Sequence, residues 1–286
     1  PLAAITVFTR YDLENVLVTG YDVTSNRPKV AAYRAPGAPM IAYGVESVID
    51  EIAEALKIDP VEIRLRNAAK EGTQTHFGPK LGPIGYIETL EHVRAHPHLK
   101  EPLGPNQGRG IATGFWFTLG AETSSTLNIN EDGTASLIIG TVDVTGGGRA
   151  AMSMIVAEEL GIPCEKVRTM SGDTSVVGVN FMTAGSRGTA AGTTAAVKAA
   201  RDAIARLCEV AARKWEVEPD QVIWEDGQAR PASANVGDFE PMSISEIVKH
   251  AVWFGGTIAG HAEINVASGG PGMGAHVDVT LSHLPI

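Results

Sequence analysis

Apolar residues recur every three or four positions in several stretches of the chain, which is the spacing of one buried face of an α-helix. In the clearest of these stretches, Val45, Val48, Ile52 and Leu56 repeat in this way. Asp59, with a proline directly after it, is typical of an N-cap that starts a further helix. The predicted helices cover residues 44–60, 61–69, 86–95, 152–160, 189–215 and 243–253.

Stretches rich in β-branched residues without that spacing predict strands. The Asp-Gly dipeptides at 132–133 and 226–227 indicate hairpins, the first with a type I′ turn. Gly161 and Pro163 are expected to end the helix before them, because glycine adopts the left-handed cap conformation and proline cannot continue a helix. The predicted strands lie within residues 3–10, 14–23, 109–118, 123–141, 166–175, 256–266 and 274–281.

Together these elements predict an α+β fold with mixed helices and sheets in two lobes. Residues 72–107 hold many Gly, Pro and His residues and are interpreted as a connector. The predicted division gives a first lobe with its connector at 1–102 and a second lobe at 103–286, which is expected to be incomplete at its C-terminal end. The chain opens at Pro1 inside strand-like sequence, which suggests a processed or truncated polypeptide.

The composition is typical of a folded globular protein, with 44% hydrophobic and 20% charged residues and a net charge of −10. An acidic chain without a basic stripe is poorly suited to phosphate backbones, so we do not expect nucleic-acid binding. The sequence has neither an apolar run of roughly 18–20 residues nor a signal peptide, which predicts a soluble cytoplasmic protein with no membrane partner. Cys164 and Cys208 are too few for a disulfide framework or a zinc site.

Two glycine-rich segments, TGGGR at 145–149 and AGSRGT at 184–189, lead directly into predicted helices. Free N–H groups at a helix start, with the positive end of the helix dipole behind them, favour an anion such as phosphate. Arg149 and Arg187 stand where a guanidinium group could fork onto that phosphate. Neither segment has the spacing of a Walker loop or of a dinucleotide-binding turn. Tight turns without a ligand, and surface salt bridges for the arginines, are the alternatives that the residues leave open.

Several motifs occur in the order and spacing found in one protein family. They are YRAPGAP at 33–39, a helix pair at 46–67, GTVDVTGGG at 140–148 with IVAEELGIP at 155–163, SGDT at 171–174, and TAGSRGTAAGTTAAVKAA at 183–200. In these motifs the chain resembles the molybdopterin-binding large subunit of the xanthine dehydrogenase and aldehyde oxidase family.

The resemblance implies a molybdopterin cofactor, in bacterial members often extended to a cytosine dinucleotide, whose dithiolene holds molybdenum without a metal ligand from the protein. It also implies that Arg34 lies near the metal and the substrate. The polar turn at 171–174 is a further expected ligand contact. The cofactor-binding residues predicted in this way are Arg34, Gly37, Ala38, Thr145, Gly146, Gly147, Gly148, Arg149, Asp173, Gly185, Ser186, Arg187 and Thr189.

The resemblance further implies an oxidoreductase that hydroxylates an aldehyde or an N-heterocycle with oxygen from water, with 2Fe-2S and FAD groups on partner subunits or domains. The chain departs from the family pattern, because glycine replaces the glutamine of the cofactor loop and the later Gly-x-Gly-Glu segment with the catalytic glutamate is absent. We therefore assign no catalytic base, and we expect the chain alone to be inactive. The alternatives are an enzyme that uses a nucleotide or CoA ester in the same anion-binding loops, and a structural or assembly domain that has lost the cofactor.

Overall fold

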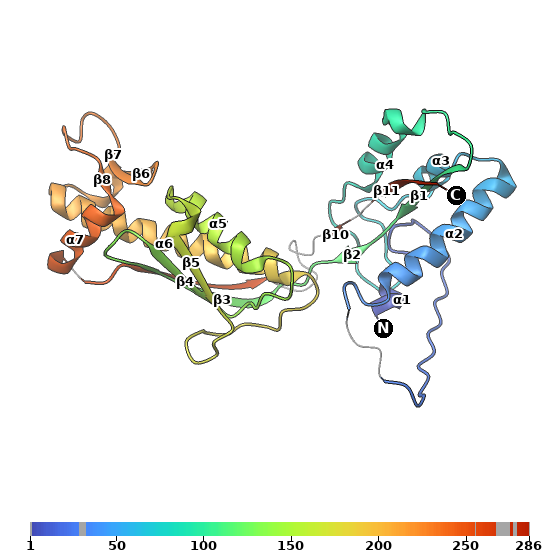
Figure 1. Ribbon diagram of the computed structural model, residues 1–286, viewed down its shortest axis with the longest axis horizontal. Coiled ribbons are helices and arrows are strands. Elements are labelled where there is room, and N and C mark those ends of the chain that lie inside the picture. Colours follow the sequence, from blue (N-terminus) through green and yellow to red (C-terminus); the bar gives the residue numbers. More distant parts are fainter. Residues whose placement is uncertain (1, 29–32, 255, 267–274, 277–278, 286) are drawn as a thin grey trace. The chain divides into compact units, whose positions relative to one another are not determined.

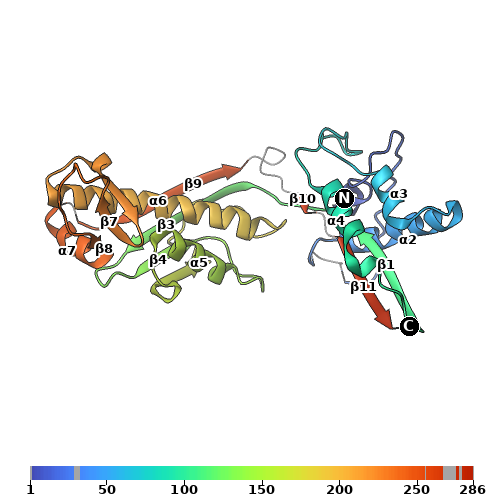
Figure 2. The ribbon, with the colours of Figure 1, turned by 90° about the horizontal axis from the view of Figure 1, so that it is seen from above.

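The computed structural model describes residues 2–28, 33–254, 256–266, 275–276 and 279–285 and divides the chain into two compact units. The first unit comprises residues 1–118 and 273–286, and the second comprises residues 119–272. Figures 1 and 2 show that each unit contains both helices and strands, so the α+β class is confirmed.

The first unit is mainly helical. Its helices are α1 (Leu2–Thr6), α2 (Ala38–Leu56), α3 (Pro60–Arg66) and α4 (Tyr86–Ala95), followed by a 3₁₀ turn at Pro97–Leu99. Its strands form two antiparallel pairs, β1 (Gln107–Thr113) with β11 (Val279–Pro285) and β2 (Trp116–Phe117) with β10 (Ala275–His276).

The start of α3 is fixed in the way that the sequence predicts. The Asp59 carboxylate accepts hydrogen bonds from the N–H groups of Val61 (2.9 Å) and Glu62 (3.0 Å), and Pro60 occupies the first helical position. This cap satisfies two N–H groups that the helix itself cannot pair.

A buried ion cluster joins the helices of the first unit to β1. The Glu46 carboxylate on α2 accepts hydrogen bonds from Arg10 Nε (3.0 Å), Arg64 Nε (2.8 Å) and the Tyr11 hydroxyl (2.6 Å). It also accepts the N–H of Thr113 on β1 at 2.8 Å. Two buried guanidinium groups thus share one buried carboxylate, which ties α2 and α3 to the strand.

The second unit contains a four-stranded sheet in the order β5-β4-β3-β9. Its strands are β3 (Ala121–Ile129), β4 (Ala135–Ile139), β5 (Val167–Ser171) and β9 (Ala259–Val266). β4 and β5 run parallel and are joined through α5 (Gly148–Leu160), whereas the other neighbouring strands are antiparallel. Such a crossover places the loop after β4 at the N-terminal end of the crossover helix.

Helix α6 (Arg187–Trp215) packs with α5 against one face of that sheet (Figure 2). Alternate residues of the strands, including Leu127, Leu137 and Ile139, face a row of alanines on α6. Gly260 on β9 allows the closest approach, because a Cβ atom there would lie 2.5 Å from the Ala203 nitrogen. The unit is completed by β6 (Val222–Glu225), β7 (Gln228–Pro231), β8 (Met242–Ser243), α7 (Ile244–Phe254), and 3₁₀ turns at Cys164–Lys166 and Pro219–Gln221.

Both predicted Asp-Gly hairpins form, but with different turns. In the loop 226–227 both residues have positive φ (49° and 75°), as a type I′ turn requires. In the loop 130–134 only Gly133 has a positive φ (80°), and the Asp132 carboxylate accepts the N–H of Thr134 at 2.9 Å. The type I′ prediction at 132–133 is therefore wrong, because an aspartate side-chain bond closes a longer loop there.

The predicted strands near the N-terminus are wrong. Residues 2–6 form α1, and the hydroxyls of Thr6 and Thr9 bond back to the carbonyls of Ala3 (3.0 Å) and Ile5 (2.5 Å), as threonines do in helical turns. Residues 14–23 form no strand, and the Leu17 side chain is 88% exposed. β-branched composition alone therefore misled the assignment in both places.

The boundary between the units also differs from the predicted one at 102/103. Residues 107–113 pair with β11 and belong to the first unit. The predicted connector at 72–107 is part of that unit's core, since Tyr86 and Leu90 of α4 are fully buried. The strand predicted at 274–281 appears as β10 and the start of β11, while residues 274, 277 and 278 lie outside the described residues.

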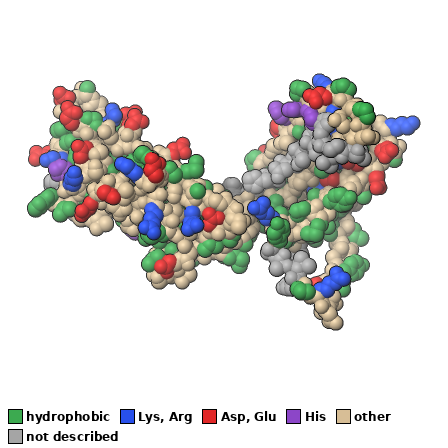
Figure 3. Space-filling view, viewed as in Figure 1, with side chains coloured by type: hydrophobic (Ala, Val, Ile, Leu, Met, Phe, Trp, Pro, Cys, Tyr) green, Lys and Arg blue, Asp and Glu red, His purple; other side chains and the backbone are tan. Residues whose placement is uncertain are grey.

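In Figure 3 basic side chains are scattered among acidic and apolar ones over the visible face. Among the described residues, no helix combines the length and apolar character needed to cross a bilayer.

Candidate functional site

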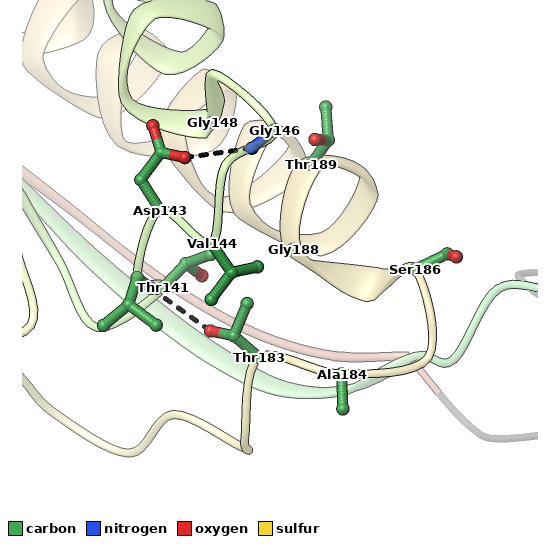
Figure 4. A pocket seen from close by; sticks show the side chains of 11 residues that line it. Thr141, Asp143, Val144, Gly146, Gly148, Thr183, Ala184, Ser186, Gly188 and Thr189 are labelled. Atoms are coloured by element: carbon green, nitrogen blue, oxygen red, sulfur yellow. Dashed lines mark hydrogen bonds between the residues drawn. The ribbon is translucent and has the colours of Figure 1, made fainter. Parts of the chain in front are cut away.

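A cavity of about 310 Å³ lies in the second unit, where the loop after β4 meets the N-terminal ends of α5 and α6 (Figure 4). Both glycine-rich segments of the sequence contribute to it. Its lining residues are Thr141, Val142, Asp143, Val144, Gly146, Gly148, Thr183, Ala184, Ser186, Gly188 and Thr189.

The first of these segments makes a tight turn into α5. Thr145 and Gly147 have positive φ values of 73° and 69°, and such a conformation is uncommon for a β-branched residue. The Asp143 carboxylate holds the turn, since it accepts the N–H groups of Gly146 (3.2 Å), Gly147 (3.2 Å) and Arg149 (3.4 Å). Cβ atoms added at positions 146–148 would meet nothing within 4 Å, so the bare backbone here faces open space.

The second segment makes a similar turn into α6. Gly185 and Ser186 both have φ values of 60°. A Cβ atom on Gly185 would lie 2.6 Å from Leu119 Cγ, so both conformation and space require glycine there. Thr183 Oγ1 accepts the N–H of Val142 at 3.1 Å, and this bond joins the two loops (Figure 4).

The structure gives Arg187 a role other than the predicted phosphate contact. Its side chain is fully buried, and its guanidinium group donates to the carbonyls of Gly120 (2.6 Å), Phe181 (2.8 Å) and Glu122 (2.7 Å), with a further bond to the Thr123 hydroxyl. Burial lowers the pKa of this guanidinium below its ordinary value. The predicted fork onto phosphate is replaced by a clamp that fixes the loop 181–187 against β3.

The other predicted polar contacts in this unit lie apart from the cavity lining. Arg149 is exposed at the start of α5, and its side chain does not line the cavity. Asp173 closes a turn of its own, because its carboxylate accepts the N–H (3.0 Å) and hydroxyl (2.6 Å) of Ser175. The Ser175 hydroxyl bond, followed by the backbone bond, lowers the pKa of Asp173.

The remaining predicted site residues belong to the first unit. Arg34 is exposed, Gly37 precedes α2 with a φ of 82°, and Ala38 is buried as the first residue of that helix. A Cβ atom on Gly37 would lie 2.6 Å from Ala3 Cβ, so this glycine permits the packing of α1 on α2. A cofactor role for these three residues stays a prediction.

Sequence reasoning missed several residues that line the cavity. Thr141 contributes a buried hydroxyl, and Asp143 contributes the carboxylate that holds the first turn. Thr183 contributes the hydroxyl that joins the two loops. The signal that could have found the first two is their place directly after β4, since polar residues at the carboxyl end of a parallel strand commonly contact ligands.

The donor set of the cavity suits a phosphate group. The hydroxyls of Thr141, Thr183, Ser186 and Thr189 line the cavity beside the start of α6, and hydroxyls and helix-terminal N–H groups are the donors that bind phosphate oxygens in other proteins. The open backbone over residues 146–148 leaves room for a flat ring against it. Among the described residues, no three or more His, Cys, Asp or Glu side chains gather in a metal-binding cluster.

Two family models with the description molybdopterin cofactor-binding domain match the chain, one over residues 89–277 and the other over residues 1–68. The first match covers both loops of the cavity and the second covers the loop around Arg34. The two matched ranges contain the motifs at 33–39, 140–148, 171–174 and 183–200.

Among curated proteins, the chain is similar to the xanthine dehydrogenase molybdenum-binding subunit of Escherichia coli O157:H7, with 35% identity over 161 residues, which is 51% of this chain and 21% of the relative. It is also similar to the carbon monoxide dehydrogenase large chain of Hydrogenophaga pseudoflava, with 29% identity over 231 residues, which is 71% of this chain and 29% of that relative. The chain thus spans between 21% and 29% of the length of these two proteins.

Among solved structures, quinoline 2-oxidoreductase from Pseudomonas putida 86 matches with a TM-score of 0.67 and 20% identity, covering 86% of this chain and 35% of that one. At this identity the match shows a shared fold.

Proposed function

Because the chain belongs to the molybdopterin cofactor-binding domain family, we propose that the cavity between the loops 141–148 and 183–189 binds the pterin of a molybdenum cofactor. The observation that carries the proposal is that two glycine-rich segments about 40 residues apart in sequence line one cavity. The open backbone at 146–148 shapes the cavity, and the hydrogen bond from Val142 to Thr183 makes it rigid. The start of α6, which has no side-chain cap, supplies hydrogen-bond donors.

We extend the proposal to the protein as a whole. It is a molybdenum hydroxylase that acts on an aldehyde or an N-heterocycle and passes electrons to 2Fe-2S and FAD groups on partner subunits or domains. Support for external electron carriers comes from the two cysteines of this sequence, Cys164 and Cys208, since a 2Fe-2S cluster takes four ligands. We also propose that the cofactor carries the cytosine dinucleotide extension.

When bound, the cofactor supplies the oxidation of a C–H carbon with an oxygen atom from water. The residues of this chain bind and orient it. Asp143 keeps the first loop in its turn, and Arg187 keeps the second loop against β3, so that the donors of both loops hold their positions before the ligand arrives. Val142 and Val144 add exposed apolar side chains to the lining. We assign the proton transfer of the reaction to no residue of this chain.

The test is cofactor content after expression in a host that makes molybdopterin. Molybdenum is measured by mass spectrometry, and the pterin by the fluorescence of its oxidised form. Gly146→Leu places a side chain in the cavity without a backbone clash, since its Cβ meets nothing within 4 Å, and we expect it to lower both signals at least about tenfold. Gly44→Leu on α2, also without neighbours within 4 Å, is the matched control and should keep both.

The outcomes separate the proposal from its alternatives. Molybdenum and pterin in equal amounts, lost together in Gly146→Leu, support it. A phosphorylated ligand without molybdenum would indicate a nucleotide- or CoA-ester-using enzyme. Absence of both from the wild-type chain, under conditions in which a relative retains them, would favour a structural or assembly domain.

A further inference from the structure

The outward face of α2 carries side chains that the sequence predicts to be buried. Val48, Ile52 and Leu56 repeat at the spacing of one buried helix face, yet these residues are 51%, 40% and 61% exposed. Towards the body of the unit α2 instead buries Glu46 of the ion cluster and Ala53, which lie on the opposite side of the helix. The apolar face of this amphipathic helix is therefore turned away from the unit to which it belongs.

These residues belong to a regular row along the helix, which we call the α2 row. Met40, Gly44, Val48, Ile52 and Leu56 follow one another at intervals of four residues, which is the commonest ridge by which two helices pack together. Met40 at the start of the row is 68% exposed, so the row is accessible at both ends and at its centre. Such a continuous apolar row on the surface marks an interaction site.

Gly44 is the second observation on this face. Glycine in the interior of a helix is less favourable than alanine, so its presence there has a cost in stability. A Cβ atom on Gly44 would meet nothing within 4 Å, so packing inside the chain does not require the glycine. A residue without a side chain suits the close approach of a group from outside the chain.

The α2 row is complementary to itself when two copies lie antiparallel. A two-fold axis at Val48 sets Met40 of each copy opposite Leu56 of the other. The same axis sets Ile52 opposite Gly44, so that a branched side chain enters the gap in the row. In a parallel pair Gly44 would face Gly44, and the gap would stay empty. The antiparallel pair also brings the positive end of each helix dipole to the negative end of the other.

The charges of the chain decide how such a pair responds to salt. Glu51 and Glu54 are exposed on α2, and with the axis at Val48 they face Val45 and Ala42 of the other copy rather than each other. Each copy carries a net charge of −10, which opposes association. Burial of apolar side chains must therefore supply the attraction, and added salt should strengthen the pair because it screens the repulsion.

From these observations we infer that α2 is a docking surface for a second copy of the chain, on which the two α2 rows pack antiparallel about Val48. One helix pair is small beside the roughly 1,200–2,000 Å² that stable interfaces bury, so we expect a dissociation constant in the micromolar range. The docking surface lies in the first unit and the proposed cofactor cavity lies in the second, so the two proposals can fail separately.

The experiment is sedimentation equilibrium of the 286-residue chain from low micromolar to several hundred micromolar protein. We expect the mean mass to rise from 30.0 kDa towards twice that value. Val48→Lys sets two ammonium groups at the axis and should raise the dissociation constant at least about a hundredfold. Val252→Lys is the matched control, because Val252 is also an exposed valine on a helix but lies on α7 of the second unit.

Cross-linking tests the antiparallel register in a Cys164→Ser background, in which the buried Cys208 remains. A mixture of Gly44→Cys chains and Ile52→Cys chains should form disulfide-linked dimers at least about tenfold faster than either chain alone, because the two positions face each other across the pair. Gly44→Leu fills the gap with its own side chain and should raise the dissociation constant about tenfold or more, while its cofactor content stays that of the wild type.

Thermal melting followed by circular dichroism at low protein concentration separates loss of pairing from loss of folding. Both chains are monomers there, and Val48→Lys changes an exposed side chain, so it should melt with the wild-type chain.

A wild-type chain that stays monomeric at every concentration would overturn the inference and indicate that a different polypeptide covers this face. A dimer that Val48→Lys leaves intact, a dimer that weakens as salt is added, or preferential cross-linking of Gly44→Cys chains with one another would also overturn it. A chain that pairs as expected but takes up neither molybdenum nor pterin contradicts the proposed function alone. A monomer that takes up both contradicts the pairing alone.

Discussion

Replacement of Glu46 by glutamine is the sharpest test of what stabilises the first unit. The carboxylate lies between Arg10 and Arg64 and also accepts the Tyr11 hydroxyl and the N–H of Thr113. Glutamine has nearly the same shape, but it removes the carboxylate that Arg10 and Arg64 share, leaving Arg64 only its contact with Asp50 (2.8 Å), and it turns an NH₂ group towards groups that donate hydrogen bonds. Removal of one partner from a buried ion pair costs about 3–5 kcal/mol.

That cost is a large fraction of the stability of a domain, which is about 5–15 kcal/mol. For a unit of this size the variant should melt roughly 10–20 °C below the wild-type chain. Because the two units can unfold separately, the assay is hydrogen exchange of peptides that cover α2, α3 and β1, in which the free energy of opening is read for the first unit alone. Exchange in α6 of the second unit should stay unchanged.

The pKa of Glu46 determines how the difference in stability between the wild type and Glu46→Gln changes with pH. Burial raises the pKa of Glu46, but the Tyr11 hydroxyl and the charges of Arg10 and Arg64 outweigh burial and bring the pKa below its ordinary value of 4.5. A carboxyl whose pKa is lowered on folding stabilises the folded state above its unfolded pKa, and this contribution is lost as the pH falls through the folded value. The gap between wild type and Glu46→Gln should therefore be full at pH 7 and shrink below about pH 4.5.

Glu62→Gln is the control on the same part of the unit. Glu62 pairs with Arg66 four residues along α3 at the surface, and such pairs contribute about 0.3–0.5 kcal/mol. A loss of less than about 1 kcal/mol in Glu46→Gln, or a loss equal to that of Glu62→Gln, would refute the buried cluster as a source of stability.

Three further predictions concern the second unit. Gly260→Ala should lose at least about 2 kcal/mol in urea unfolding, because the added Cβ meets the backbone of α6 at Ala203. Arg187→Lys should lose about 2 kcal/mol and speed hydrogen exchange in the loop 181–186, because an ammonium group cannot make the fork of bonds to β3. At pH 8 Cys164 should react with a thiol reagent while Cys208 reacts only on unfolding, since burial and the charge of a neighbouring glutamate raise the Cys208 pKa to about 11.

The two substitutions among these predictions have matched controls. Gly114→Ala adds a Cβ that meets nothing within 4 Å and should change stability by less than about 0.5 kcal/mol. Arg149→Lys alters an exposed arginine and should leave both stability and exchange as they are. Equal losses in Gly260→Ala and Gly114→Ala, unchanged exchange in Arg187→Lys, or rapid labelling of both thiols in the folded chain would contradict the respective arguments.

Apart from α1, which was predicted as a strand, the helices were predictable from the sequence because their signals are local. The cap at Asp59, the left-handed residue at Gly161 and the alanine-rich face of α6 each depend on a few neighbouring side chains, and each is present in the structure. The strand assignments at 3–10 and 14–23 failed because strand formation depends on a partner elsewhere in the chain, which composition does not reveal.

In the candidate site, too, local features were predictable and contacts with distant parts of the chain were not. Glycine runs before helices mark the turns at 145–149 and 184–189, and both line the cavity. The fate of Arg187 was not predictable, since its bonds go to backbone carbonyls of β3 and of the loop before α6, and a carbonyl acceptor has no signature in the sequence. The hydrogen bonds that Asp143 accepts from the turn were not predicted, because an aspartate two residues before a turn is equally typical of a solvent-exposed side chain.

The position of β9 in the sheet has a consequence for synthesis of the protein. β3 pairs on one edge with β4, a few residues later, but its other edge waits for Ala259–Val266, about 130 residues after Ile129. At about 5–20 residues per second, a ribosome leaves that edge uncovered for roughly 7–26 seconds. During this interval the nascent second unit offers a strand edge to any other unfinished chain, so slow translation or a stall before residue 259 should direct it towards aggregation or chaperone capture.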